Sequence, residues 1–253
     1  VPADAKGAAQ LLVKDRGVLA GVELSLLIFK EVDPALLVNV FIQDGAWIEP
    51  GQIVLEVSGS SQSILKAERL VLNCMQRMSG IATKTHRIVS LLKTTKTRIL
   101  DTRKTTPGLR YLEKWAVRIG GGVNHRIGLY DMILIKDNHV DYAGGIANAI
   151  NQANAYLKET GRRLQIEIEV RNLTELEEVL ATGNVNRIML DNFEYEKTKE
   201  AIQIIDGRFP VESSGNINPQ TVRAYADCGV DYVSMGYLTH SAKSLDLSLK
   251  AVK

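Results

Sequence analysis

The spacing of apolar residues divides the chain into two differently patterned parts. Residues 8–60 hold short apolar runs separated by the turn dipeptides Asp44-Gly45 and Pro50-Gly51, around the helical pattern VELSLLIFKEV. This arrangement predicts several strands and one helix. From residue 63 to about residue 92 the apolar side chains recur at helical spacing, which predicts one long helix or two helices separated near Ser79-Gly80.

After residue 95 the pattern becomes a repeated alternation of strand and helix. Six apolar segments read as buried parallel strands: ILDTR, DMILIKD, QIEIEV, RIMLDN, PVESSG and DYVSMG. Several of the helical segments between them start at Asn, Thr or Pro and end at Gly, as helix capping predicts. This succession indicates a barrel or a doubly wound sheet, and the absence of G-x-G-x-x-G after the first strand disfavours a dinucleotide-binding fold. We therefore predict an α/β fold in which an N-terminal α/β sandwich (residues 1–94) precedes an α/β barrel (residues 95–238).

Composition restricts the class of protein. At 253 residues and 45% hydrophobic content, the chain can bury one large core or two modest ones. It has no apolar run long enough to span a membrane and no N-terminal signal-peptide layout. Cys74 and Cys228 are isolated thiols without metal-type spacing. They fit a reducing compartment, so we expect a cytoplasmic location and no membrane partner.

Positive charge is concentrated in one segment of an otherwise balanced chain. The net charge is only +2, yet residues 84–126 hold eleven lysines and arginines against two acids. Such a segment is typical of a site for an anionic ligand or of a nucleic-acid-binding face. ILDTRK and MILIKDNH run buried strands directly into cations, which is how barrel enzymes position charge. Aromatic residues for stacking are sparse there (Tyr111, Trp115 and Tyr130), and no nucleic-acid motif is present, so we expect a small-molecule ligand.

Several motifs in fixed order carry a family resemblance. DTRKTTPGLR, GGGVNHRIGLYD and LIKDNHV follow one another, with AERLVLNCMQRMSGIAT upstream and IEIEV, IMLDNF, VESSGNI and VDYVSMGYLTHS downstream. Over nearly its whole length the chain resembles the quinolinate phosphoribosyltransferases. The resemblance implies an incomplete, mostly parallel barrel, with the tail at residues 239–253 packing back on the first domain. It also implies a helical segment with an acidic motif ahead of Val1, so we expect the printed sequence to be part of a longer chain.

The resemblance further implies an activity and a set of site residues. The expected substrates are quinolinate and phosphoribosyl pyrophosphate, the expected cofactor is Mg²⁺, and the expected assembly is a homodimer with shared active sites, or a higher oligomer. The implied catalytic residues are Lys104, Lys136, Glu169 and Asp191, of which Glu169 and Asp191 also become candidate metal ligands. The implied substrate-binding residues are Arg69, Thr102, Arg103, Lys104, His125, Arg126, Lys136, Glu169, Asp191, Ser214, Gly215, Asn216, Met235, Gly236 and Tyr237.

The residue types in this set suit the chemistry. Arginine can bind a planar carboxylate with two hydrogen bonds, and the matched quinolinate contacts are Arg103, His125 and Arg126. A lysine at the end of a buried strand needs an anionic partner, which describes Lys104 and Lys136. Glycine in the SSGN and SMGY turns lets backbone amides approach a phosphate.

Blander interpretations remain open for single members of the set. Arg69 alone reads as a solvated helix residue, and His125 alone reads as a packed, hydrogen-bonded histidine. Glu167 lies on the same strand face as Glu169, so only the resemblance chooses between these two acids. A related phosphoribosyltransferase or pyrophosphorylase with a different acceptor, of the molybdenum-transport-associated type, is the alternative activity. The joint presence of Arg69, Arg103, His125 and Arg126 favours quinolinate.

Overall fold

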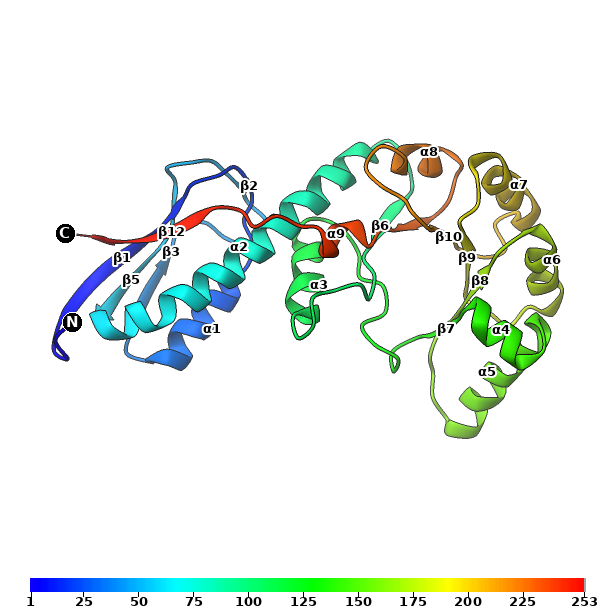
Figure 1. Cartoon of the computed structure of the whole chain (residues 1–253), viewed down its shortest axis with the longest axis horizontal. Helices are drawn as coiled ribbons and strands as arrows, with labels where there is room; N and C mark the ends of the chain where they lie inside the picture. Colours follow the sequence, from blue (N-terminus) through cyan, green and yellow to red (C-terminus); the bar gives the residue numbers. More distant parts are fainter. Residues whose placement is uncertain (253) are drawn as a thin grey trace. The chain divides into compact units, whose positions relative to one another are not determined.

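The computed structural model describes residues 1–252, which form two compact units (Figure 1). The first unit combines residues 1–87, 105–122 and 238–252, and the second combines residues 88–104 and 123–237. The predicted domains were residues 1–94 with the tail at 239–253, and residues 95–238; in the structure the chain also returns to the first unit between these segments. Residues 105–122, which follow the DTRK motif, belong to the first unit.

A four-stranded antiparallel sheet forms the base of the first unit. Its strand order is β12-β1-β5-β3. The strands are β1 (Lys6–Val13), β3 (Leu37–Val40), β5 (Ile53–Ser60) and β12 (Leu247–Val252), and the small pair β2 (Gly17–Val18) and β4 (Trp47–Ile48) stands beside them. β12 pairs with β1 from Ala8 to Val13, so the C-terminal strand completes the sheet of the N-terminal unit.

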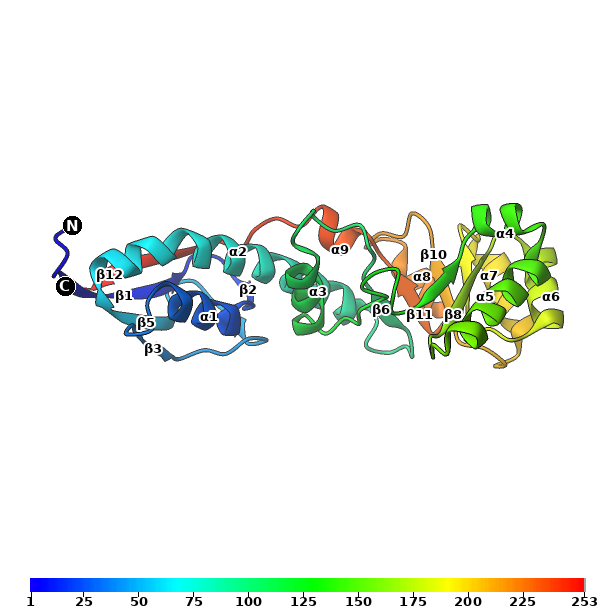
Figure 2. The same cartoon turned by 90° about the horizontal axis from the view of Figure 1, so that it is seen from below.

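Two helices cover the apolar face of this sheet. They are α1 (Val22–Val32) and α2 (Ser61–Leu91). α2 runs alongside β12 and β1 (Figure 2). Leu11, Leu55 and Leu249 lie opposite one another on neighbouring strands and are buried with Phe29 of α1 and Met75 of α2. Because strand side chains alternate between faces, this shared register gives the sheet one buried apolar side.

α2 is continuous through Ser79 and Gly80, which confirms one long helix, the first of the two predicted alternatives. A β-carbon at position 80 would lie 1.9 Å from the carbonyl oxygen of Lys243. Glycine is therefore required because the C-terminal tail passes directly against the helix, and the residue marks a close approach of two backbones.

The sequence pattern did not indicate α3 (Arg110–Ile119), which also belongs to the first unit. Its buried Glu113 accepts hydrogen bonds from Arg77 of α2, at 2.7 Å and 3.1 Å, and from the backbone N–H of Thr106. Arg77 also donates to the carbonyl oxygens of Thr239 and Ala242. One ion pair thus connects α2, α3, the segment after DTRK and the tail.

The second unit is built on a six-stranded parallel sheet in the order β6-β11-β10-β9-β8-β7. The strands are β6 (Arg98–Leu100), β7 (Ile133–Ile135), β8 (Ile166–Val170), β9 (Arg187–Asp191), β10 (Val211–Ser214) and β11 (Tyr232–Ser234). Every strand neighbours the next in sequence except that β6 pairs with β11 and not with β7. This is the strand order of a barrel with one opening, which confirms the predicted incomplete, parallel barrel.

Helices follow most of these strands, and α6 and α7 lie along the same side of the sheet (Figure 1). The helices are α4 (Asp137–Ala143), α5 (Ile146–Thr160), α6 (Leu173–Thr182), α7 (Tyr195–Ile205), α8 (Val222–Asp227) and the short α9 (Tyr237–His240). Asn172 caps α6 by accepting the backbone N–H of Glu175. Within residues 1–252, no helix is both long and apolar enough to cross a membrane.

Candidate active site

Nearly all the predicted site residues of the second unit lie at or just beyond the carboxyl ends of the parallel strands. In parallel strands these ends share one edge of the sheet. Thr102, Arg103 and Lys104 follow β6, Lys136 follows β7, Glu169 and Asp191 lie near the ends of β8 and β9, Ser214, Gly215 and Asn216 end β10, and Met235, Gly236 and Tyr237 follow β11. Arg69 lies elsewhere, on α2 of the first unit, and its side chain is exposed.

Strand register puts one polar set on the face opposite to the helices. Leu134 pairs with Glu167, Glu167 with Arg187, and Glu212 with both Met189 and Tyr232. The alternate positions, such as Ile166, Ile168, Ile188 and Val211, are buried and apolar. The strands therefore bury apolar side chains on one face and gather ionisable side chains on the other.

Lys136 and Glu169 form an ion pair at the edge of this polar face. Nζ of Lys136 lies 2.8 Å from Oε2 of Glu169, whose side chain is only 7% exposed, while that of Lys136 is 47% exposed. The backbone N–H of Lys136 donates to Nδ1 of His139 at the start of α4. The ammonium group thus reaches the solvent side of a buried carboxylate, where an anionic ligand can approach it.

The turn after β6 presents two exposed cations, Arg103 and Lys104. The backbone N–H of Lys104 donates to the hydroxyl of Thr102 at 3.1 Å, so Thr102 holds the turn. Burial, followed by the charge of Arg103, lowers the pKa of Arg126, so these two guanidinium groups lie near each other. Two neighbouring guanidinium groups repel each other and are stabilised by a bound dianion.

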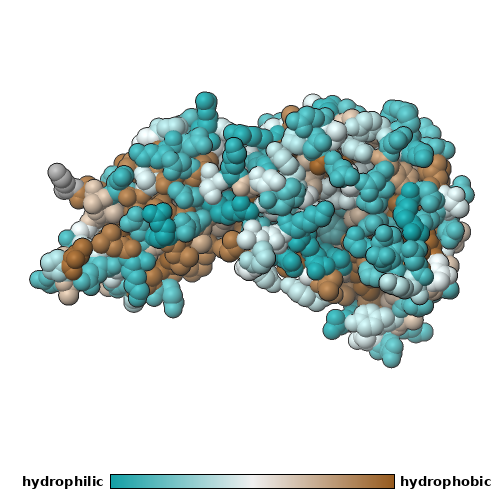
Figure 3. Space-filling view, in the orientation of Figure 1, coloured by the Kyte–Doolittle hydropathy of each residue, from teal (hydrophilic) through white to brown (hydrophobic). Residues whose placement is uncertain are grey.

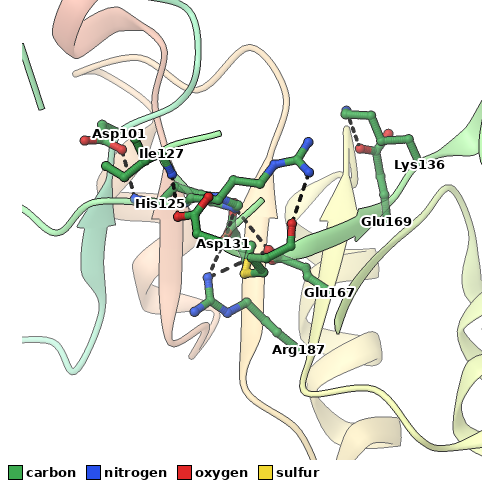
Figure 4. A network of polar contacts seen from close by, with 11 residues as sticks. Asp101, His125, Ile127, Asp131, Lys136, Glu167, Glu169 and Arg187 are labelled. Atoms are coloured by element: carbon green, nitrogen blue, oxygen red, sulfur yellow. Dashed lines mark hydrogen bonds and ion pairs between the residues drawn. The ribbon is translucent and has the colours of Figure 1, made fainter. Parts of the chain in front are cut away.

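His125 is held by the protein on three sides (Figure 4). Its backbone N–H donates to the buried carboxylate of Asp101 at 2.8 Å, and its Nδ1 accepts the backbone N–H of Arg126 at 2.7 Å. Its Nε2 lies 3.0 Å from Glu167 and 3.5 Å from Glu212. Both ring nitrogens therefore face protein groups, and the ring fixes the backbone beside Arg126.

Three further ionisable residues stand behind His125. Arg187 lies 3.2 Å from Glu212 and 3.9 Å from Glu167, and its guanidinium carbon is 4.4 Å from the centre of the Tyr232 ring. Burial, followed by the charge of Glu167, raises the pKa of Glu212 to about 8. Burial likewise raises the pKa of Glu167. Because Glu167 and Glu212 are both buried and their carboxyl groups are close together, ionising both of them costs free energy.

In the two glycine turns after β10 and β11, part of the backbone is already held by contacts within the sheet. Gly215 has φ +100°, and a β-carbon there would overlap the side chain of Asn192. The N–H of Asn192 donates to the carbonyl of Ser214, which locks the ends of β9 and β10 together. At β11 the N–H of Met235 donates to the carbonyl of Leu100, and the Met235 side chain is buried. The Met235 amide is therefore used by the sheet.

Two groups of residues could hold a metal ion. Glu169 and Asp191 offer carboxylate oxygens on adjacent strands, and these are the donors that Mg²⁺ prefers. Lys136 donates to one oxygen of Glu169, and the side-chain amide of Asn192 donates to one oxygen of Asp191. His125, Glu167 and Glu212 also have ligand atoms within 4.8 Å of one another. The guanidinium of Arg187 already occupies the Glu212 carboxyl in that second group, which disfavours a cation there. The donor chemistry fits Mg²⁺ better at Glu169 and Asp191.

Sequence reasoning missed Glu212, Arg187 and Asp101, although two of them leave a signal. Arg187 begins β9 two alternations before Asp191, and Glu212 follows the apolar Val211 in β10, on the face that carries Glu167. A charge at such a position points toward a buried polar face. Asp101 ends the segment RILD, where it reads as a routine strand terminus.

The open parallel barrel with cations along its carboxyl edge defines an enzyme that binds strongly anionic substrates. Comparison with known proteins gives the family. Residues 1–79 match the model described as "Quinolinate phosphoribosyl transferase, N-terminal domain", and residues 81–250 match that of the C-terminal domain. The chain belongs to the quinolinate phosphoribosyltransferase family.

Named relatives agree with this assignment. A rice protein, the chloroplastic carboxylating nicotinate-nucleotide pyrophosphorylase, is 46% identical over 99% of this chain and 71% of its own length. A probable nicotinate-nucleotide pyrophosphorylase of Bacillus subtilis is 40% identical over 95% of this chain and 82% of its own length. The solved nicotinate-nucleotide pyrophosphorylase of Francisella tularensis superposes with a TM-score of 0.92 at 38% identity, covering 98% of this chain and 87% of that one.

Proposed function

We propose that this chain transfers the phosphoribosyl group of phosphoribosyl pyrophosphate to quinolinate and releases pyrophosphate and carbon dioxide, forming nicotinate mononucleotide. The observation that carries the proposal is the row of cations at the carboxyl edge, in a chain of this family. Arg103 and Arg126 face one region, as two carboxylates on one ring require, and Lys136 stands at the next strand end.

The side chains act by binding and orienting the reactants. Arg103 and Arg126 hold the carboxylates so that the ring nitrogen of quinolinate faces the anomeric carbon of the donor. The nitrogen forms its bond to that carbon as the bond to pyrophosphate breaks, and Lys104 and Lys136 stabilise the negative charge that develops. The bond between C2 of the ring and its carboxylate then breaks. The electron pair stays on C2 beside the positive ring nitrogen, and a proton from water replaces the carbon dioxide.

Mg²⁺ belongs to the same proposal. Glu169 and Asp191 would hold it, and when bound it would offset the charge of the pyrophosphate. The turn at Ser214, Gly215 and Asn216 receives the 5′-phosphate, because Gly215 and Asn216 have positive φ and successive backbone amides in such a turn can bind an anion. The amide of Met235 takes no part in this, since it bonds to Leu100.

We also propose a homodimer in which Arg69 of one chain completes the site of the other. Arg69 is exposed on α2, and Leu65 and Leu70 beside it are more than half exposed. Leu27 and Ile28 of α1 line an apolar pocket together with Leu70, and apolar residues gather over α1 on the molecular surface (Figure 3). An apolar face next to an exposed arginine is the composition expected of a subunit interface.

The cytoplasmic location inferred from the free thiols remains part of the proposal; the rice relative is named chloroplastic.

A coupled assay tests the activity. The protein is incubated with phosphoribosyl pyrophosphate, Mg²⁺ and quinolinate, and nicotinate mononucleotide and carbon dioxide are measured together. Nicotinate, which lacks the second carboxylate, serves as the control acceptor. It leaves one cation of the pair Arg103 and Arg126 without its carboxylate, so its turnover should be negligible. Comparable turnover of nicotinate would show a different acceptor specificity and refute the proposal.

A further inference from the structure

A buried cluster of ionisable side chains contacts His125. Glu167, Arg187 and Glu212 come from three neighbouring strands, and Glu167 and Glu212 are fully buried. Their ligand atoms and that of His125 lie within 4.8 Å of one another. Two carboxyl groups with one guanidinium are one positive charge short of neutrality unless one carboxyl group carries a proton.

The hydrogen bonds of His125 fix where its own proton lies. The backbone N–H of Arg126 can only donate, so Nδ1 of His125 is the acceptor and the ring proton is on Nε2. Nε2 lies 3.0 Å from a carboxyl oxygen of Glu167 and 3.5 Å from one of Glu212, so the ring is in direct contact with both carboxyl groups. The ring therefore transmits the position of the two carboxyl groups to the backbone of Arg126.

The surroundings of Glu212 favour its neutral form. Glu167 on β8, Arg187 on β9, Ser234 on β11 and His125 are the polar and charged groups that face it. Burial and the neighbouring carboxylate raise its pKa to about 8, against a smaller opposing effect of His125 and Arg187. A proton on Glu212 can be shared with Glu167, and Glu167 then balances Arg187. Glu167 and Asp131 act on the charge of Arg126, and a neutral Glu212 adds no further carboxylate behind them that would compete with a dianionic ligand.

We propose that Glu212 is a positioning residue for quinolinate binding, which as a neutral carboxylic acid bonded to Glu167 holds the His125 ring and through it the backbone of Arg126. This inference rests on the proposed function, because it concerns the acceptor subsite of that reaction. Glu212 does not touch the substrate; it acts only through Glu167 and His125.

Two substitutions at this position separate its shape from its charge. In Glu212→Gln the neutral amide can still donate to Glu167, so we expect the KM for quinolinate to stay within about twofold of the wild-type value. In Glu212→Ala the contact is lost, and we expect that KM to rise about tenfold or more while the KM for phosphoribosyl pyrophosphate changes less than about threefold. Glu200→Ala, an exposed acid on α7, is the matched control.

The dependence of the KM for quinolinate on pH is a second test. A residue with a purely structural role would leave this dependence unchanged when it is substituted. In the wild type, ionisation of Glu212 near pH 8 adds a buried negative charge, so the KM for quinolinate should rise on the alkaline side. Glu212→Gln cannot ionise and should lack that rise. An unchanged KM in Glu212→Ala, or an alkaline rise that persists in Glu212→Gln, would overturn the inference.

Failure of the inference is distinguishable from failure of the proposed function. A wild-type protein that does not turn over quinolinate refutes the function, and this inference falls with it. An active wild type with normal variants refutes the inference alone. If Glu212→Ala fails to fold by circular dichroism, the KM and pH profile of Glu212→Gln still decide the question.

Discussion

At the scale of single residues, burial decides which role an ionisable side chain can take. Glu212 is fully buried and favours its neutral form, which suits a group that holds other groups in place. Lys136 is half exposed beside a buried carboxylate, which suits a group that meets a charged ligand. The same sheet thus supplies both kinds of site, because Glu212 lies within a strand and Lys136 follows the end of one.

The raised pKa of Glu212 predicts how stability depends on pH. In the unfolded chain this group ionises near 4.5, whereas in the folded protein it keeps its proton up to about pH 8. The folded state therefore binds more protons between these values, and the free energy of unfolding contributed by this group falls as the pH rises through that window. Glu212→Gln lacks this dependence. Its melting temperature relative to the wild type should increase between about pH 5 and about pH 8.5, and a constant difference in thermal scans would contradict the assignment.

Removing a single cation from the carboxyl edge should abolish turnover and leave the fold intact. Arg103→Ala and Lys136→Ala each remove a charge that faces the anionic ligand, so kcat/KM for quinolinate should fall by about 100- to 1,000-fold. Lys199→Ala on α7, where an exposed lysine pairs with Glu196, is the control and should behave as the wild type. Circular dichroism verifies folding. Near-normal turnover in either variant would mean that the pocket lies elsewhere.

At the scale of elements, α2 illustrates how tertiary contact overrides local preference. Alanine normally stabilises a helix relative to glycine by about 1 kcal/mol. At position 80 the new β-carbon would meet the backbone of Lys243, so Gly80→Ala should instead destabilise the protein by about 1 to 3 kcal/mol. Urea unfolding gives the sign, with Lys66→Ala at an exposed position of the same helix as the reference. A gain in stability would show that the tail moves away from the helix.

The strands of the second unit were predictable because their signal is local. RILD, IEIEV and RIMLD are short apolar segments with an acidic residue at or next to their carboxyl end, and each contains a strand of the parallel sheet. The cluster of Glu167, Arg187 and Glu212 was not predictable, because it depends on the register between strands that are distant in sequence. α3 was missed because Glu113 and Lys114 are charged residues in buried positions, which blur the apolar stripe. Arg69 was found through family resemblance, and its role stays a prediction.

At the scale of the whole molecule, a shared site makes two inactive variants complementary. Arg69→Ala and Lys136→Ala should each be inactive alone if Arg69 acts in the partner's site. After mixing and subunit exchange, about half of the dimers are mixed and each holds one intact site, so recovery should approach roughly a quarter of the wild-type activity. Mass spectrometry verifies the exchange. A verified mixture that stays inactive would show that Arg69 does not complete its partner's site.

The opening in the barrel order leaves the sheet with two outer strands, and this has a consequence for handling the protein. β7 is a three-residue apolar strand that pairs only with β8 among the described strands. An outer strand of this composition is a template for unwanted pairing with other chains, which charged neighbours suppress. Asp131, Lys136 and Asp137 flank β7 and serve as such gatekeepers. The lysine proposed to meet substrate is therefore also expected to oppose association, and variants at Lys136 should be stored dilute and checked by light scattering before their activity is compared.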